Sequence, residues 1–173
     1  MDQKYIIPVK MINSVPVAMI PLELSRTFPS RGMLMALCEI SDHSFVVPLE
    51  PDGNGSHFFL CLNPLSNLIH NGFLPNIGLT LLPAKDWPDP ELPNDLLDKL
   101  TQEGLLFFWN QITVKAKWEW IRWIRSTVNV ATRQKRLDLA CIKLSHGDKR
   151  PCCFDSSRCT MPDLSKTGRI SLS

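Results

Sequence analysis

The first half of the chain has the pattern of short β-strands separated by turns. Runs of apolar and β-branched residues recur about every ten residues, as in small barrels and sandwiches. We expect six strands, at Tyr5–Met11, Val15–Leu22, Met33–Ile40, Ser44–Leu49, His57–Leu62 and Ile77–Leu82. The turn at Asp52–Gly55 is the strongest in the chain, because its two glycines adopt positive φ at little cost. Pro8 lacks a backbone N–H and predicts an edge position for the first strand.

One helix is expected within this β-region, over residues 63–72. Asn63 suits the N-cap, Pro64 suits the first helical position, and Gly72 suits the C-terminal end.

The pattern changes after Leu82. Residues 83–93 contain four prolines and predict a linker. Beyond it the apolar spacing becomes helical, with Thr113 as one N-cap. We expect helices over residues 94–102, 105–111, 114–125 and about 128–146. The fold class is therefore α+β, a closed N-terminal β-barrel of about six strands followed by a C-terminal helical unit. The expected divisions are residues 1–82, 83–93, 94–147 and a cysteine-containing tail at 148–173.

The last two helices each carry an apolar stripe that we expect to be buried. The stripes consist of Ala116, Trp120, Trp123 and Ile124 in the first, and Val130, Leu137, Cys141 and Leu144 in the second. Trp118, Arg122 and Arg125 share another face, where a cation–π contact to the Trp118 indole is expected.

Composition indicates a chain that can bury a core. The 173 residues are 44% hydrophobic, with a mean hydropathy of −0.04. No apolar run approaches the roughly 20 residues of a membrane-spanning helix, and the N-terminus lacks the pattern of a signal peptide. We therefore expect a cytoplasmic protein with reduced cysteines.

The net charge of +2 conceals an uneven distribution. Residues 1–112 contain 6 Lys and Arg against 12 Asp and Glu, whereas residues 113–173 contain 13 against 5. A basic second half favours an anionic partner such as nucleic acid. Arg133, Arg136 and Lys143 form the best candidate row for phosphate contacts. The alternative is that they form a solvated face of a helix.

The six cysteines fall into two kinds. Cys38 and Cys61 lie in apolar strand runs and are expected to be buried thiols. The weak candidates for a metal site are His146, Cys152, Cys153 and Cys159, since zinc binds thiolate and imidazole. Their spacing is not that of a standard zinc finger, so we predict no stoichiometric zinc and no cofactor. A peroxide-sensing thiol pair and a tail of idle thiols are the alternatives.

No catalytic motif is recognisable. The sequence contains no HExxH, no GxSxG and no phosphate-binding loop, because no Gly-Lys-Ser/Thr follows the glycines at 53 and 55. We therefore expect a protein that is not an enzyme and has no catalytic residues.

Two parts of the chain resemble known families. Cys38-Glu39-Ile40, Val46-Val47-Pro48-Leu49, Asp52-Gly53-Asn54-Gly55-Ser56-His57 and Phe59-Leu60-Cys61-Leu62-Asn63 are similar to a small β-barrel domain of unknown function. That domain often precedes a YdeI/OmpD-associated domain. Seven segments of the second half are similar to the YdeI/OmpD-associated domain itself: Leu92–Leu96, Phe107–Gln111, Trp123-Ile124, Thr132–Arg136, Gly147–Phe154, Cys159-Thr160 and Leu164–Gly168.

The resemblance implies a function in bacterial stress. The YdeI/OmpD-associated family is also labelled bacteriocin-protection, which implies resistance to antimicrobial peptides or to envelope stress rather than a reaction. The first hypothesis is therefore a cytoplasmic, non-enzymatic accessory protein that acts through contacts with an unidentified protein partner. The second is a nucleic-acid-binding regulator that uses the basic helices, whose binding would weaken steeply as salt rises. The sequence does not specify the oligomeric state.

Overall fold

The computed structural model describes residues 3–172, which fold into two compact units. The barrel unit consists of the described residues up to Pro83, residues 156–159, and the described residues from Asp163 onward. The helical unit consists of residues 84–155 and 160–162. The C-terminal segment therefore contributes to both units.

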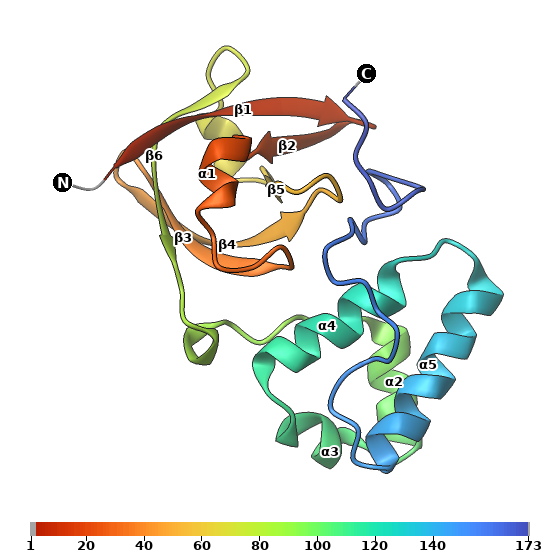
Figure 1. Ribbon diagram of the computed structural model, residues 1–173. Helices are drawn as coiled ribbons and strands as arrows, with labels where there is room; N and C mark the ends of the chain where they lie inside the picture. The colour runs from red at the N-terminus through yellow and green to blue at the C-terminus, as the bar shows by residue number, and fades with distance from the viewer. Residues whose placement is uncertain (1–2, 173) are drawn as a thin grey trace. The chain divides into compact units, whose positions relative to one another are not determined.

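The barrel unit is a closed antiparallel barrel, as predicted (Figure 1). Its strands are β1 (Lys4–Ile12), β2 (Val15–Met19), β3 (Leu34–Ile40), β4 (His43–Pro51), β5 (His57–Leu60) and β6 (Phe73–Leu81). They pair in the order β1-β2-β5-β4-β3-β6, and β6 returns to β1. The core consists of inward-facing side chains, including the fully buried Ile7, Phe59, Leu74 and Ile77.

Closure of the barrel corrects the prediction that Pro8 marks an edge strand. β1 pairs with β2 on one side and with β6 on the other, and Pro8 lies opposite Phe73. Pro8 itself pairs with β6 alone, because the β1–β2 ladder begins at Val9, so its missing N–H breaks no ladder hydrogen bond on the β2 side. Val9, the next residue, donates its backbone N–H to the Gly72 carbonyl at 2.8 Å.

The helix predicted over residues 63–72 is wrong in length and type. Only a 3-10 turn forms there, η1 (Leu65–Leu68). The Asn63 side chain accepts a bond from the Asn67 side chain at 2.9 Å rather than capping a backbone N–H. Ile69 is already extended, so the segment leaves the helical conformation after one turn. The second predicted strand is also shorter than expected, since it ends at Met19 and Leu22 begins the short helix α1 (Leu22–Arg26).

The turn at Asp52–Gly55 holds the C-terminal segment against the barrel unit. One Asp52 carboxylate oxygen accepts the backbone N–H groups of Asn54 and Ser56. Ile170 donates its N–H to the Asp52 carbonyl at 2.9 Å, and its own carbonyl accepts from the Asn54 side chain at 2.8 Å. Gly53 has a φ of +80°, and a Cβ there would lie 2.0 Å from the Gly168 carbonyl oxygen. Glycine is thus required by both conformation and space.

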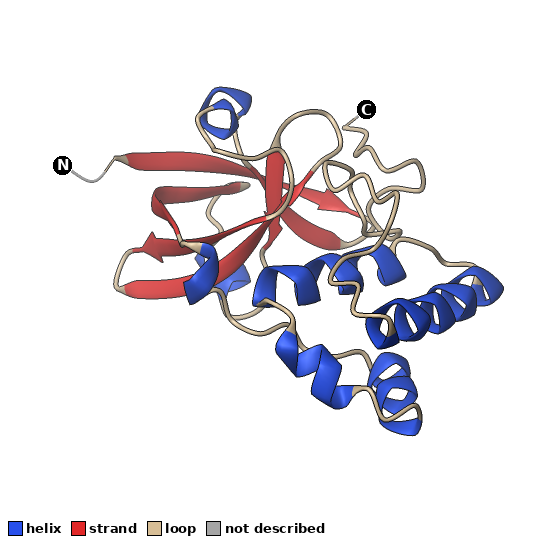
Figure 2. Cartoon of the chain, turned by 60° about the horizontal axis from the view of Figure 1, so that its bottom comes forward, coloured by secondary structure: helices blue, strands red, loops and turns tan. Residues whose placement is uncertain are grey.

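The helical unit contains the helices that the sequence predicts (Figure 2). They are α2 (Asn94–Gln102), α3 (Leu106–Gln111), α4 (Val114–Arg125) and α5 (Val130–Ser145), preceded by the 3-10 turn η2 (Ala84–Asp86). Thr113 caps α4 by accepting the Ala116 N–H at 3.2 Å, as expected. Asn129 caps α5 by accepting the Thr132 N–H at 2.9 Å, which fixes the start of that helix.

The predicted apolar stripes of α4 and α5 contribute to the helical core, with two corrections. Trp120 is fully buried, but Trp123 is only partly buried and packs edge-on against it at 5.7 Å between ring centroids. Val130 is 83% exposed, because it is the first residue of α5 and the buried residues of that helix begin at Leu137.

Candidate functional site

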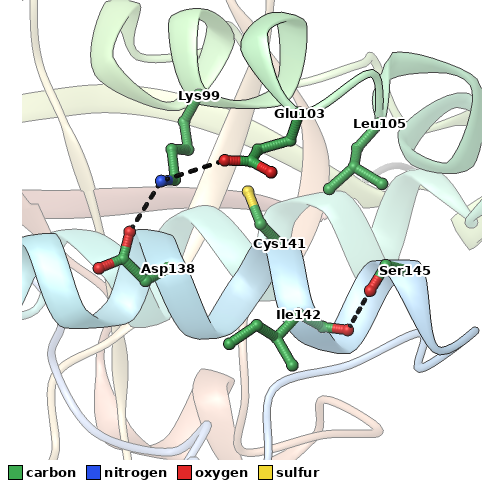
Figure 3. Close-up of a pocket in the computed structure, with 7 residues that line it drawn as sticks. All are labelled: Lys99, Glu103, Leu105, Asp138, Cys141, Ile142 and Ser145. Carbon is green, nitrogen blue, oxygen red and sulfur yellow. Dashed lines mark hydrogen bonds and ion pairs between the residues drawn. The ribbon is translucent and has the colours of Figure 1, made fainter.

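A pocket of about 310 Å³ opens between α2 and α5 of the helical unit (Figure 3). α2 and the turn after it supply one side, and α5 supplies the other. The lining residues are Lys99, Glu103, Leu105, Asp138, Cys141, Ile142 and Ser145. Helical spacing explains the α5 side, since residues three or four apart lie on one face.

Ion pairs fix the polar side of the pocket. The Lys99 ammonium lies 3.0 Å from an Asp138 carboxylate oxygen and 3.5 Å from one of Glu103. Its hydrogen bond to Asp138 raises the pKa of Lys99 and lowers the pKa of the Asp138 carboxyl, which also accepts from Gln134. Both groups are therefore charged near neutral pH. The lining thus contains two carboxyl groups, of Glu103 and Asp138, and one amine, of Lys99.

Cys141 supplies a thiol to the lining, near both charged and apolar residues. Figure 3 shows its sulfur directed toward α2, beside the Glu103 carboxylate. Burial is the largest cause of the raised pKa of this thiol. Because the nucleophile is the thiolate and not the thiol, Cys141 is poorly suited to covalent catalysis near neutral pH. The pocket can hold a group that combines positive charge with apolar surface.

The structure places the three predicted phosphate-binding residues in contacts within the helical unit. Arg133 makes a bidentate pair with Asp95, at 2.6 and 2.9 Å, and Arg136 donates to the Trp123 carbonyl at 2.7 Å. The Lys143 ammonium lies 3.9 Å from a carboxylate oxygen of Asp148. A phosphate group would have to compete with these partners. The arrangement therefore favours a structural role for Arg133, Arg136 and Lys143, in which they stabilise the helical unit. Nucleic-acid binding stays a prediction.

The cation–π contact predicted for Arg122 is formed with a different ring. Arg122 lies over Phe154 at 5.5 Å from the ring centroid, whereas the Trp118 indole donates to the Pro88 carbonyl at 2.9 Å. Arg136 makes a second such contact, over Trp123 at 5.5 Å.

The four tail candidates for a metal site are divided between the two units. His146 is the C-cap of α5, and Cys152 and Cys153 are exposed in the helical unit, whereas Cys159 is buried and belongs to the barrel unit. Among residues 3–172, no group of three or more His, Cys, Asp or Glu side chains is placed to hold a metal ion. The absence of stoichiometric zinc stays a prediction.

A buried polar cluster in the barrel unit was not predicted. The Ser25 hydroxyl lies 2.7 Å from Nδ1 of His57, and both residues are fully buried. Nε2 of His57 lies 2.9 Å from the Gly32 carbonyl, which can only accept, so Nε2 carries a proton and a neutral ring accepts from Ser25 at Nδ1. Arg31 adds bonds to the Ser25 and Gly55 carbonyls.

This Ser–His pair resembles a nucleophile and its base, but its burial excludes substrate in the observed structure. Its contacts connect α1 to β5 and to the segment before β3, which is a structural role. No spacing in the sequence relates positions 25, 31 and 57, so only the fold could reveal the cluster.

Comparison with known proteins finds a family match within the helical unit. Residues 89–147 match the family described as bacteriocin-protection, YdeI or OmpD-associated. This stretch includes α2 to α5 and all seven residues of the pocket. No curated protein and no solved structure gave a significant match. None of the described helices is long and apolar enough to cross a membrane.

Proposed function

We propose that the protein is a non-enzymatic accessory protein that acts through protein contacts, because residues 89–147 match the bacteriocin-protection, YdeI or OmpD-associated family. In this proposal it contributes to the protection of a bacterium against bacteriocins or envelope stress. The helical unit supplies the contact surface.

An exposed aromatic pair on α3 carries this proposal. Phe107 is 68% exposed and Phe108 is 42% exposed, and their rings pack edge-on at 5.8 Å between centroids. Trp109, the next residue, is buried in the helical core. Aromatic side chains are enriched in the cores of protein interfaces, and neighbouring exposed rings suit contact with a partner.

The pocket supports binding rather than catalysis. Lys99 and Asp138 neutralise each other in an ion pair at 3.0 Å, and burial keeps Cys141 in the thiol form. A general acid or base works best with a pKa near the operating pH. The shifts of Lys99 and Asp138 move their pKa values away from neutrality.

Survival of bacteria that express the full chain tests the proposal. The measurement is survival against increasing concentrations of a pore-forming bacteriocin, with an empty vector for reference. We expect the wild-type chain to increase survival, and the double variant Phe107→Ser/Phe108→Ser to lose that increase. Both side chains are exposed, so the variant should keep its far-ultraviolet circular dichroism spectrum and thermal midpoint.

Val128→Ser is the matched control, since Val128 is 77% exposed in the same unit but lies outside α3. This variant should protect as well as the wild type. Equal survival with the wild-type chain and the empty vector would refute the protective function. Full protection by the folded double variant would refute the role of the α3 surface.

A further inference from the structure

Cys152 and Cys153 form an exposed thiol pair on a turn of the helical unit. Their sulfur atoms lie 3.0 Å apart and both side chains are exposed. Neighbouring side chains of an extended segment point to opposite sides. Here Cys153 has a φ of +57°, and this left-handed residue lies in a bend that brings the two thiols together.

The turn is held to α4 on both sides of the pair. Before the cysteines, the Lys149 carbonyl accepts the indole N–H of the fully buried Trp120 at 3.0 Å. After them, the Phe154 ring lies under the guanidinium of Arg122, which is 1% exposed. Two buried side chains of one helix therefore hold the segments that flank residues 152–153.

We propose that Cys152 and Cys153 are a redox-active dithiol, which low-molecular-weight disulfides oxidise reversibly to a disulfide between adjacent residues. The site is independent of the proposed function, because it uses neither α3 nor the pocket. It is a covalent modification site whose co-reactant is a small disulfide such as glutathione disulfide.

The reaction proceeds by two thiol–disulfide exchanges. One cysteine thiolate attacks a sulfur of the small disulfide, forms a mixed disulfide and expels a small thiolate. The second cysteine then attacks the protein sulfur of that mixed disulfide and expels the other small thiolate. The protein loses two electrons and two protons, and the small disulfide becomes two thiols.

The electrostatics of the pair favour Cys152 as the attacking group. The pKa of Cys153 is raised, first by its hydrogen bond to Cys152 and then by the repulsion that a charged Cys152 exerts. Cys153 therefore gives up its proton less readily than an ordinary exposed thiol. Its thiol then lies 3.0 Å from the sulfur that it must later attack.

Adjacency makes the disulfide reversible. Consecutive Cα atoms lie about 3.8 Å apart across a trans peptide bond, below the roughly 4.4–6.8 Å that usual disulfides span. A strained and exposed disulfide is more easily reduced than a structural one. The expected product therefore returns to the dithiol when a reductant is added.

The sequence allows a direct test by peptide mass spectrometry. Trypsin cleaves after Lys149 and after Arg158, while Pro151 protects the bond after Arg150. The resulting peptide 150–158 contains Cys152 and Cys153 and excludes Cys159. The native, full-length protein is incubated with glutathione disulfide, alkylated and digested. We expect this peptide to lose the mass of two hydrogen atoms and to regain it after dithiothreitol.

Single variants separate the two steps. Cys152→Ser and Cys153→Ser should each stop as a stable glutathione adduct, because no second thiol remains to displace it. Cys159→Ser is the matched control and should still form the disulfide between Cys152 and Cys153. The proposal would be overturned if the wild-type peptide 150–158 accumulated glutathione adducts without forming the disulfide, or if it remained unmodified.

Discussion

The two tryptophans of α4 allow the packing of the helical unit to be tested by one pair of substitutions. Trp120 is fully buried, and its indole N–H donates to the Lys149 carbonyl at 3.0 Å. Trp123 is partly buried and packs edge-on against Trp120 on one side and under Arg136 on the other. The apolar spacing of the sequence predicts that both are core residues. The structure predicts that replacing Trp120 lowers the free energy of unfolding more than replacing Trp123.

The magnitude for Trp120→Ala follows from what the indole contacts. Replacing a buried tryptophan by alanine costs about 3–5 kcal/mol through lost transfer free energy and the cavity that remains. The aromatic pair contributes about 0.5–1.5 kcal/mol and the hydrogen bond about 1 kcal/mol, and such terms do not add fully. We expect Trp120→Ala to lower the free energy of unfolding by about 4 kcal/mol. Trp123→Ala, at the partly buried site, should lower it by about 2 kcal/mol.

Urea unfolding followed by circular dichroism in the helical band measures both losses. This signal reports the helical unit and does not depend on tryptophan fluorescence, which the substitutions themselves alter. The dependence of the free energy on urea should stay unchanged, which shows that only stability has changed. A loss below about 1 kcal/mol for Trp120→Ala, or a larger loss for Trp123→Ala than for Trp120→Ala, would refute this description of the core.

Three further predictions concern the barrel turn, an ion pair and the thiols. Gly53→Ala should lower the thermal midpoint, because a Cβ there would lie 2.0 Å from a backbone oxygen of the C-terminal segment and φ is +80°; an unchanged midpoint would contradict this. Arg133 lowers the pKa of Asp95, so the pair contributes stability above the unfolded carboxyl pKa of about 4 and loses it as pH falls through the lower folded value. Asp95→Asn should accordingly reduce stability at pH 7, and its difference from the wild type should narrow below about pH 4 in denaturation curves. Burial raises the pKa of Cys38 to about 11, so iodoacetamide at pH 8 should label it far more slowly than the exposed Cys152, and equal rates would count against the buried barrel thiol.

Local signals predicted most of the elements because the physics that defines them is local. Thr113 accepts the backbone N–H three residues later, and the periods of two and 3.6 residues separated strands from helices. Local rules failed where neighbours in space decided the outcome. Pro8 fits into a strand of the closed barrel because the β1–β2 ladder begins only at Val9, and Asn63 bonds to a side chain instead of capping a helix.

The candidate sites depended far more on tertiary contacts. The sequence showed the basic residues of α5 as a row. It did not show that Arg133 forms an ion pair with Asp95, which lies 38 positions earlier in the chain. The pocket needed α2 and α5 to meet, and the Ser25–His57 contact joins residues 32 positions apart. Such pairs have no signature in a single sequence, because nothing local connects their positions.

The sequence by itself therefore determined an antiparallel barrel followed by helices, and the resemblance of its second half to the bacteriocin-protection family. These rest on periodicity, turn residues and motifs, all of which are local properties of the chain. Only the tertiary structure decided the order in which the strands pair, that Trp120 rather than Trp123 is fully buried, and that Cys152 and Cys153 bring their sulfurs to 3.0 Å. The physical reason is that strand order, burial and the conformation of a tight turn depend on contacts between residues that the linear order separates, and on a backbone that those contacts hold in place.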